Sequence, residues 1–228
     1  MKSALLATAA LALTLAACSK EVRAEHDRAD AGVSAATQTA TETAPDTASD
    51  AVAVATPAPM TPEQTIVAEA RTCAGAADTT MLVVDPPADG NQNPQANAAA
   101  AIAYLDAVRA EPCVFELPSG LLFRIREASE DGISPIAGDM VTVHYRGMFT
   151  YGGEFDSSYA RGEPATFPSN RLIAGWVEAL PLMRVGESWD LFIAPELAYG
   201  PRGTPGGPIG PNEALAFQLE LLDVVFDR

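Results

Sequence analysis

Very few side chains in this chain could perform covalent, proton-transfer or metal chemistry. The 228 residues contain two histidines, His26 and His144, and three cysteines. Neither histidine has ligand spacing to a cysteine, so we expect no metal site and no cofactor. His144 alternates out of phase with its apolar strand neighbours and should face solvent, which excludes a serine–histidine–aspartate triad. The informative polar residue is Asp156, a carboxylate directly after Phe155 with no plausible base or metal around it, and this pattern favours an electrostatic role over proton transfer.

Asp156 belongs to one of four short blocks that follow one another in the second half of the chain. The blocks are Val143-His144-Tyr145-Arg146-Gly147, Gly153-Glu154-Phe155-Asp156-Ser157-Ser158, Gly175-Trp176 and Pro195-Glu196-Leu197-Ala198-Tyr199-Gly200. Together they resemble the FKBP-type peptidyl-prolyl cis-trans isomerases, over roughly Leu117 to Arg228, about half of the chain. Several blocks in register are far more specific than one short motif.

The resemblance implies a desolvated aromatic pocket for a prolyl ring, with substrate donors around it. The implied catalytic residues are Tyr145, Phe155, Asp156, Trp176, Tyr199 and Phe217. The implied substrate-binding residues are Leu172, Ile173, Arg161 and Ile209. Within these sets the backbone N–H of Ile173 and the hydroxyl of Tyr199 would donate to substrate carbonyls, and Ile209 would be the apolar tip of a flap.

Each of the four pocket aromatics, Tyr145, Phe155, Trp176 and Phe217, could instead be a core residue between sheet and helix, and Asp156 also has a purely structural alternative. Trp176 would be the pocket floor, but its helical spacing accounts equally well for a core residue. Asp156 would act on the twisting amide, or hold a structural hydrogen bond to Tyr145 or Arg161, and both roles are compatible. The chain departs from the family at Gly210, which replaces a common proline in a flap one residue longer than usual.

The elements that must position these residues are mainly strands. Apolar side chains alternate with polar ones near residues 121–126, 141–146, 188–193 and 215–221. Residues 170–180 instead carry apolar residues at helical spacing, with Ser169 or Asn170 as the cap. One short amphipathic helix among antiparallel strands predicts an α+β fold, a curved antiparallel sheet wrapped around that helix. The same fold is implied by the resemblance.

The first half of the chain divides into three expected segments. Residues 1–18 have the pattern of a secretory signal that ends in a lipobox, so Cys18 would be acylated; the alternative is an ordinary signal peptide in which Cys18 is incidental. Residues 19–59 are too polar to form a core and predict a disordered tether. Residues 60–113 predict a helical segment, with one helix starting at Thr61-Pro62 and a second over 97–110, ahead of an isomerase domain over 114–228. The segment is either a dimerisation arm, which would make the protein a homodimer, or a local cap on the domain.

Charge and cysteine usage bound the partners and the compartment. The net charge is −16, from 14 basic and 30 acidic residues, which excludes nucleic acid as a partner. With Cys18 acylated, Cys73 and Cys113 remain and predict a disulfide in an oxidising compartment. The sequence thus predicts a lipid-anchored isomerase on the periplasmic side of the bacterial outer membrane, acting on proline-containing polypeptides of exported proteins. The alternatives are a non-catalytic peptide-docking module and a structural envelope lipoprotein.

Overall fold

The structure, a computed structural model, describes residues 58–76, 80–87 and 90–226. The signal peptide expected over residues 1–18, its Cys18, and nearly all of the tether expected over 19–59 lie outside the described residues. The described residues fall within one unit, residues 55–228. None of their helices is long and apolar enough to cross a membrane.

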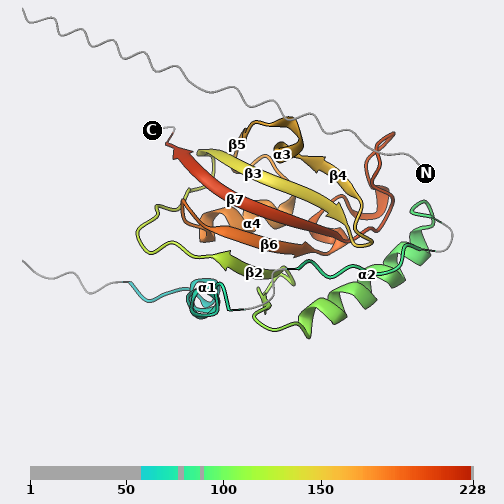
Figure 1. Cartoon of the computed structure of the whole chain (residues 1–228), viewed down its shortest axis with the longest axis horizontal. Coiled ribbons are helices and arrows are strands. Elements are labelled where there is room, and N and C mark those ends of the chain that lie inside the picture. The colour runs from blue at the N-terminus through green and yellow to red at the C-terminus, as the bar shows by residue number, and fades with distance from the viewer. Residues whose placement is uncertain (1–57, 77–79, 88–89, 227–228) are drawn as a thin grey trace, which may run out of the picture. The chain divides into compact units, whose positions relative to one another are not determined.

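An antiparallel sheet forms the framework of this unit (Figure 1). Its strand order is β1-β2-β6-β7-β3-β4, and β5 pairs with β3 beside β4. The strands are β1 (Phe115–Glu116), β2 (Leu122–Glu127), β3 (Met140–Phe149), β4 (Glu154–Ser157), β5 (Ala165–Pro168), β6 (Ser188–Ile193) and β7 (Leu215–Val225). The two longest strands, β3 and β7, pair over their full lengths and cross the middle of the sheet.

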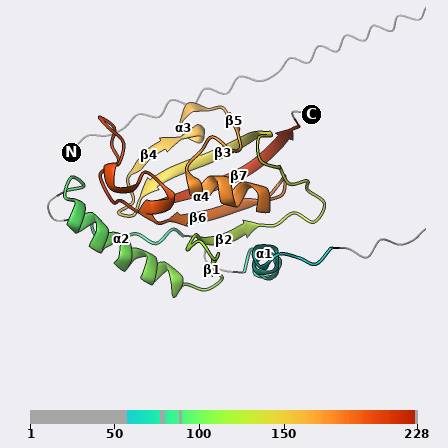
Figure 2. The same cartoon turned by 180° about the vertical axis from the view of Figure 1, so that it is seen from behind.

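One face of the sheet wraps around the helix α4 (Ala174–Ala179), as Figure 2 shows from behind. The alternating residues of β2, β3, β6 and β7 that face this helix form the main core, together with Trp176, Ala179 and Leu180. The predicted α+β fold is therefore confirmed. The helix itself is shorter than predicted: it begins after Ile173, whose backbone is extended, and passes at Leu180 into the 3₁₀ helix η1 (Leu180–Leu182). Ser169, one expected cap, instead bonds Gly138 and Ile136 across the loop before β3.

On the opposite face of the sheet, α2 (Pro94–Arg109) packs against one part, formed by residues of β2, β6 and the start of β7. Tyr104 and its neighbours on this helix pack on Leu122 and Phe192 in a second, smaller core. Two expectations for this helix were wrong. It begins at Pro94 rather than Asn97, because Asn93 caps it and a proline fits the first turn. The helical spacing of Ile102, Leu105 and Val108 in the sequence also predicts one apolar face, but Ile102 is 64% exposed, because Tyr104 rather than Ile102 fills the space above the sheet.

The first helix, α1 (Pro62–Thr72), begins at the predicted Thr61 cap and packs on the main core through Val67 and Ala70. Arg71 near its end forms an ion pair with Glu187 at 2.7 Å and donates to the carbonyl of Leu182. Glu187 is fully buried, so α1 supplies the counter-ion of a carboxylate inside the sheet domain.

Three short helices complete the unit. α3 (Ser158–Arg161) follows β4, and the 3₁₀ helices η2 (Pro195–Leu197) and η3 (Gly200–Arg202) lie between β6 and β7. A disulfide joins Cys73, after α1, to Cys113, before β1, with Cα atoms 5.8 Å apart. Both long helices are thus attached to the sheet covalently as well as by packing.

Candidate functional site

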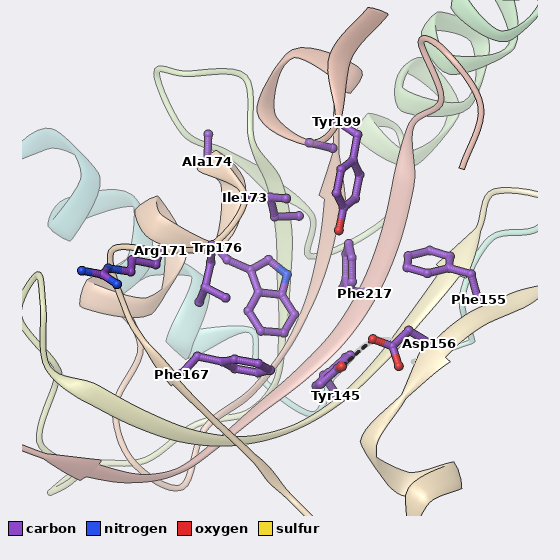
Figure 3. Close-up of a pocket in the computed structure, with 12 residues that line it drawn as sticks. Tyr145, Phe155, Asp156, Phe167, Arg171, Ile173, Ala174, Trp176, Tyr199 and Phe217 are labelled. Carbon is purple, nitrogen blue, oxygen red and sulfur yellow. Dashed lines mark hydrogen bonds between the residues drawn. The ribbon is translucent and has the colours of Figure 1, made fainter. Parts of the chain in front are cut away.

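A pocket of about 550 Å³ opens between the sheet, the start of α4 and the segment after β6. Figure 3 shows the side chains that converge on it. Strands β3, β4, β5 and β7 supply Tyr145, Phe155, Asp156, Phe167 and Phe217, and the segments around α4 and η2 supply the remaining residues, Arg171, Leu172, Ile173, Ala174, Trp176, Ala198 and Tyr199. All six residues expected to be catalytic line this pocket.

Trp176 lies at the centre of the aromatic wall. Its ring meets those of Tyr145 and Phe217 edge to face, with centroids 5.3 and 5.4 Å away, and Phe155 meets Phe217 in the same way at 5.6 Å. Edge-to-face packing lets each ring support the next without filling the pocket. Trp176 is only 4% exposed and belongs to the main core. It is therefore both a core residue and part of the pocket wall.

Gly147 on β3 lies against the Phe155 and Phe217 rings of this wall. This close contact explains why the first sequence block ends in glycine. A Cβ atom there would come within 2.7 Å of the Phe155 ring and 2.8 Å of the Phe217 ring. Any side chain would therefore displace two rings of the pocket. The glycine is required by close packing rather than by its backbone conformation.

Asp156 forms a closed hydrogen-bonded triangle with Tyr145 and Arg161 at the pocket edge. The Tyr145 hydroxyl donates to Asp156 Oδ2 at 2.5 Å and accepts from Arg161 Nη2 at 2.9 Å, while Arg161 Nη1 donates to Asp156 Oδ1. The guanidinium also lies over the Tyr145 ring, 5.3 Å from its centroid. Burial and the hydrogen bond to Asp156 raise the pKa of Tyr145, so its hydroxyl remains a donor at neutral pH.

Two further donors face the pocket without an internal acceptor. Ile173 lies at the N-cap of α4, and within the described part of the chain its backbone N–H makes no hydrogen bond. The Tyr199 hydroxyl points into the pocket from the opposite side (Figure 3). Burial raises the pKa of Tyr199, with a smaller contribution from the charge of Asp156, which keeps this hydroxyl protonated too. A ligand carbonyl could accept from either group.

The remaining expected substrate residues are placed differently from one another. Leu172 lines the pocket beside Ile173, whereas Arg161 is not part of the lining and is bonded to two lining residues, Asp156 and Tyr145. Ile209 is not part of the lining: its side chain is 5% exposed and belongs to the main core, while its backbone closes the flap on Thr204. The end of the flap thus folds back against the sheet domain, and the substrate-binding role expected of Ile209 stays a prediction.

Four pocket residues were absent from the sequence prediction: Phe167, Arg171, Ala174 and Ala198. The signal for Phe167 was its alternation with Ala165, since the two share one face of β5. Its ring centroid lies 6.3 Å from that of Tyr145 and 6.5 Å from that of Trp176, so it extends the aromatic wall. Arg171 is exposed, and no local pattern sets it apart from other surface residues.

The pocket is lined mainly by aromatic and aliphatic side chains, an arrangement suited to binding an apolar group. Across residues 58–76, 80–87 and 90–226, no three histidine, cysteine or acidic side chains gather to hold a metal ion. His144 stacks on Tyr159 and contacts the Ser158 hydroxyl at 2.9 Å, outside the pocket. The predicted solvent-facing position of His144 is only partly right, because α3 half-covers the ring.

Comparison with known proteins relates this site to a family of enzymes. Residues 132–222 match the model of the FKBP-type peptidyl-prolyl cis-trans isomerases. "Outer membrane protein MIP" of Legionella longbeachae is 43% identical over 143 residues, which cover 63% of this chain and 60% of the relative. "Peptidyl-prolyl cis-trans isomerase Mip" of Coxiella burnetii is 47% identical over 128 residues, 56% of this chain and 55% of the relative. The chain thus spans a little over half the length of these curated relatives.

A solved structure gives a comparison over nearly a whole chain. The peptidyl-prolyl cis-trans isomerase from Pseudomonas syringae pv. tomato superimposes with a TM-score of 0.54 at 33% identity. The match covers 59% of this chain and 97% of that one. The residues matched by the family model, 132–222, include every residue that lines the pocket.

Proposed function

The chain belongs to the FKBP-type peptidyl-prolyl cis-trans isomerase family, and we propose from the pocket it carries that it catalyses cis-trans isomerisation of Xaa-Pro bonds in polypeptides. The observation that supports this most is the convergence of Tyr145, Phe155, Trp176 and Phe217 on one cavity with two unpaired donors at its edge. A prolyl ring needs an apolar site of this kind, and the flanking carbonyls need donors.

The reaction requires no proton transfer and no covalent intermediate. Rotation about the Xaa-Pro bond faces a barrier of about 18–20 kcal/mol, because the planar amide loses resonance as it twists. Water stabilises the planar, dipolar form, so a dry aromatic pocket favours the twisted form relative to it. In the proposed mechanism Trp176 lies under the ring, and Ile173 N–H and the Tyr199 hydroxyl hold the flanking carbonyls. Asp156, fixed by Tyr145 and Arg161, provides the electrostatic field at the rotating bond.

A proline-peptide isomerisation assay tests the proposal directly. The purified full chain, made non-lipidated by Cys18→Ser, should accelerate isomerisation of Xaa-Pro peptides, with apolar Xaa favoured because the pocket lining is mainly aromatic and aliphatic. Phe155→Ala should remove most of the acceleration, because the ring borders the proline site without filling the core. Wild-type rates equal to the uncatalysed reaction would instead support a docking module that binds proline peptides without turnover.

The cellular setting is a second part of the proposal. The name of the Legionella relative places that protein in the outer membrane, and the lipobox pattern at Cys18 and the disulfide between Cys73 and Cys113 suit an exported protein. We therefore propose a lipid-anchored isomerase that faces the periplasm and assists folding of exported proteins. Mass spectrometry of the mature N-terminus tests the anchor: a diacylglyceryl group on Cys18 is expected, and an unmodified mature start at another residue would contradict it.

A further inference from the structure

The loop between η3 and β7, residues 203–213, is held by the segment that leads into α2, residues 91–97. We call the first segment the flap and the second the brace. In the brace, Asn97 Nδ2 donates to the carbonyl of Pro211 at 2.8 Å, and Asn91 Nδ2 donates to the carbonyl of Pro208 at 2.6 Å. In the opposite direction Asn212 Nδ2 donates to the carbonyl of Pro94 at 3.2 Å. Side-chain amides thus bond three backbone carbonyls across the contact.

The contact is closely fitted around Gly210. A Cβ atom on Gly210 would lie 1.7 Å from the carbonyl oxygen of Asn91, so this position admits no side chain. The Gly210 N–H donates to Glu213 Oε2 at 2.5 Å, and the same oxygen accepts from Asn91 Nδ2 at 3.3 Å. The contact explains why glycine replaces the proline that is common at this position of the flap: a proline would clash with the brace and would lack the N–H.

Stability of α2 does not by itself account for these bonds. The apolar attachment of this helix to the sheet lies further along it, where Tyr104 and Val108 pack on Leu122 and Phe192. Asn97 is 2% exposed, and among the described residues its Oδ1 has no hydrogen-bond partner. A buried acceptor without a partner is costly, so this asparagine is a poor choice for stability alone. Its Nδ2, by contrast, has two acceptors, the carbonyls of Asn91 and Pro211.

The flap in turn is connected to the pocket. The backbone N–H of Asn212 donates to the carbonyl of Gly200 at 2.9 Å, and Gly200 directly follows Tyr199. Thr204 and Ile209 close the far end of the flap on each other through backbone and hydroxyl bonds. A shift of the flap away from the brace would therefore move the backbone that carries the Tyr199 hydroxyl.

We propose that Asn91 and Asn97 are positioning residues of the isomerase, which hold the flap so that Tyr199 is set to bind the substrate carbonyl. The inference rests on the proposed function, since it assigns a role within the same pocket. It makes the segment before α2 part of the enzyme rather than a spacer. Because Tyr199 holds bound substrate, loss of the brace should act mainly on KM and less on kcat.

Two variants and one control test this role in the full chain. Asn97→Ala removes both Nδ2 bonds, and Gly210→Ala pushes the flap from Asn91 while leaving α2 unchanged. Gln95→Ala is the matched control, because Gln95 is an exposed neighbour on the same helix turn. In hydrogen exchange, the amide of Asn212 should exchange at least about fivefold faster in both variants, and that of Gly210 in Asn97→Ala, whereas amides in β6 should not change. The kcat/KM for proline peptides should fall roughly three- to tenfold, mainly through KM.

The outcomes separate this role from the proposed function. Wild-type activity together with unchanged kcat/KM in both variants would overturn the positioning role alone, whether or not flap exchange had increased. Unchanged flap exchange in both variants would also overturn it. An inactive wild-type chain would overturn the proposed function and the positioning role together.

Discussion

At the scale of single residues, the triangle of Asp156, Tyr145 and Arg161 makes the structural and electrostatic roles of the carboxylate compatible. Each Asp156 oxygen accepts a hydrogen bond, one from Tyr145 and one from Arg161, so its position is fixed before substrate arrives. A carboxylate held by two donors is a well-oriented charge.

Asp156→Asn tests this charge with little change of shape. The variant should lower kcat/KM about tenfold or more, because the field at the rotating bond is lost while the pocket walls remain. Glu154→Gln is the control: Glu154 is two residues away on β4, forms an exposed ion pair with Arg146 and does not line the pocket. Circular dichroism should be unchanged in both. An equal fall of the peptide-isomerisation rate in both variants would show that the rate depends on the net charge of the protein and not on a carboxylate at position 156.

The same cluster predicts how activity responds to alkaline pH. Burial and Asp156 raise the pKa of Tyr145, and burial raises that of Tyr199, so both hydroxyls stay protonated beyond the usual tyrosine value of about 10. A raised pKa favours the protonated form in the folded state, so its contribution is complete below about pH 10 and is lost only above it. We expect a flat kcat/KM from about pH 7 to about pH 9.5. A bell-shaped profile in that range would indicate proton transfer and contradict the mechanism.

Sequence reasoning found the aromatic wall because its residues sit in contiguous blocks, such as Phe155 beside Asp156. The sequence could not predict a residue's environment where that environment depends on residues distant in the chain. Ile209 is buried because the flap turns inward, and nothing local to residues 200–211 encodes the brace that holds it. Phe167 was missed for the opposite reason: its pattern is an ordinary strand alternation, and only the packing on Trp176 makes it part of the pocket.

At the scale of elements, the predicted helix starts were right where cap and proline coincide, as at Thr61-Pro62, and the overlooked Asn93-Pro94 has the same signature. The sequence left open whether these helices form a cap or a dimerisation arm. In the structure each packs on the sheet, α1 on the main core and α2 on the second core. The alternating polar residues of β2 could not show whether their face of the sheet meets solvent or α2. In the structure one of these residues, Arg124, is buried and forms an ion pair with Asp190.

Arg71→Met tests how far α1 supports the domain. The substitution leaves Glu187 buried without its counter-ion, because Glu187 is fully buried and its other partners are neutral donors such as the Trp189 indole. Unfolding in urea should show a loss of about 3–5 kcal/mol. Arg109→Met is the matched control on α2, where the pair with Glu116 is exposed and should contribute about 0–1 kcal/mol. Equal losses in the two variants would contradict a supporting role for α1.

At the scale of the whole molecule, both helices that precede the boundary expected at residue 114 pack on the sheet of the isomerase domain. A fragment starting at Glu111 would lack both helices, leaving Glu187 unpaired and the Leu122 and Phe192 side chains exposed. We expect it to aggregate or to show strongly reduced isomerase activity, whereas a fragment starting at residue 58 should match the full chain. Size-exclusion chromatography and the peptide assay on the two fragments check this. A soluble, fully active fragment that starts at Glu111 would instead support an independent domain that begins near residue 114.

The disulfide between Cys73 and Cys113 determines how firmly these helices stay attached. It closes a loop with a sequence separation of 40 residues that contains α2 and the brace. On the chain-entropy model such a loop closure stabilises the fold by up to about 4 kcal/mol, less any order retained in the reduced chain. Reduction leaves the packing of α1 and α2 in place, so the native state should persist without denaturant and remain active.

The expected result of reduction is therefore a change in stability rather than in rate. The reduced and alkylated protein should unfold at a lower urea concentration and be cleaved faster by protease between residues 74 and 112, while its isomerase activity without urea stays close to that of the oxidised form. Activity should be lost at lower urea in the reduced protein, because the flap loses its brace when α2 detaches. Identical urea midpoints for the two forms would contradict a stabilising bridge, as would two free thiols titrated in the unfolded, unreduced protein after periplasmic expression.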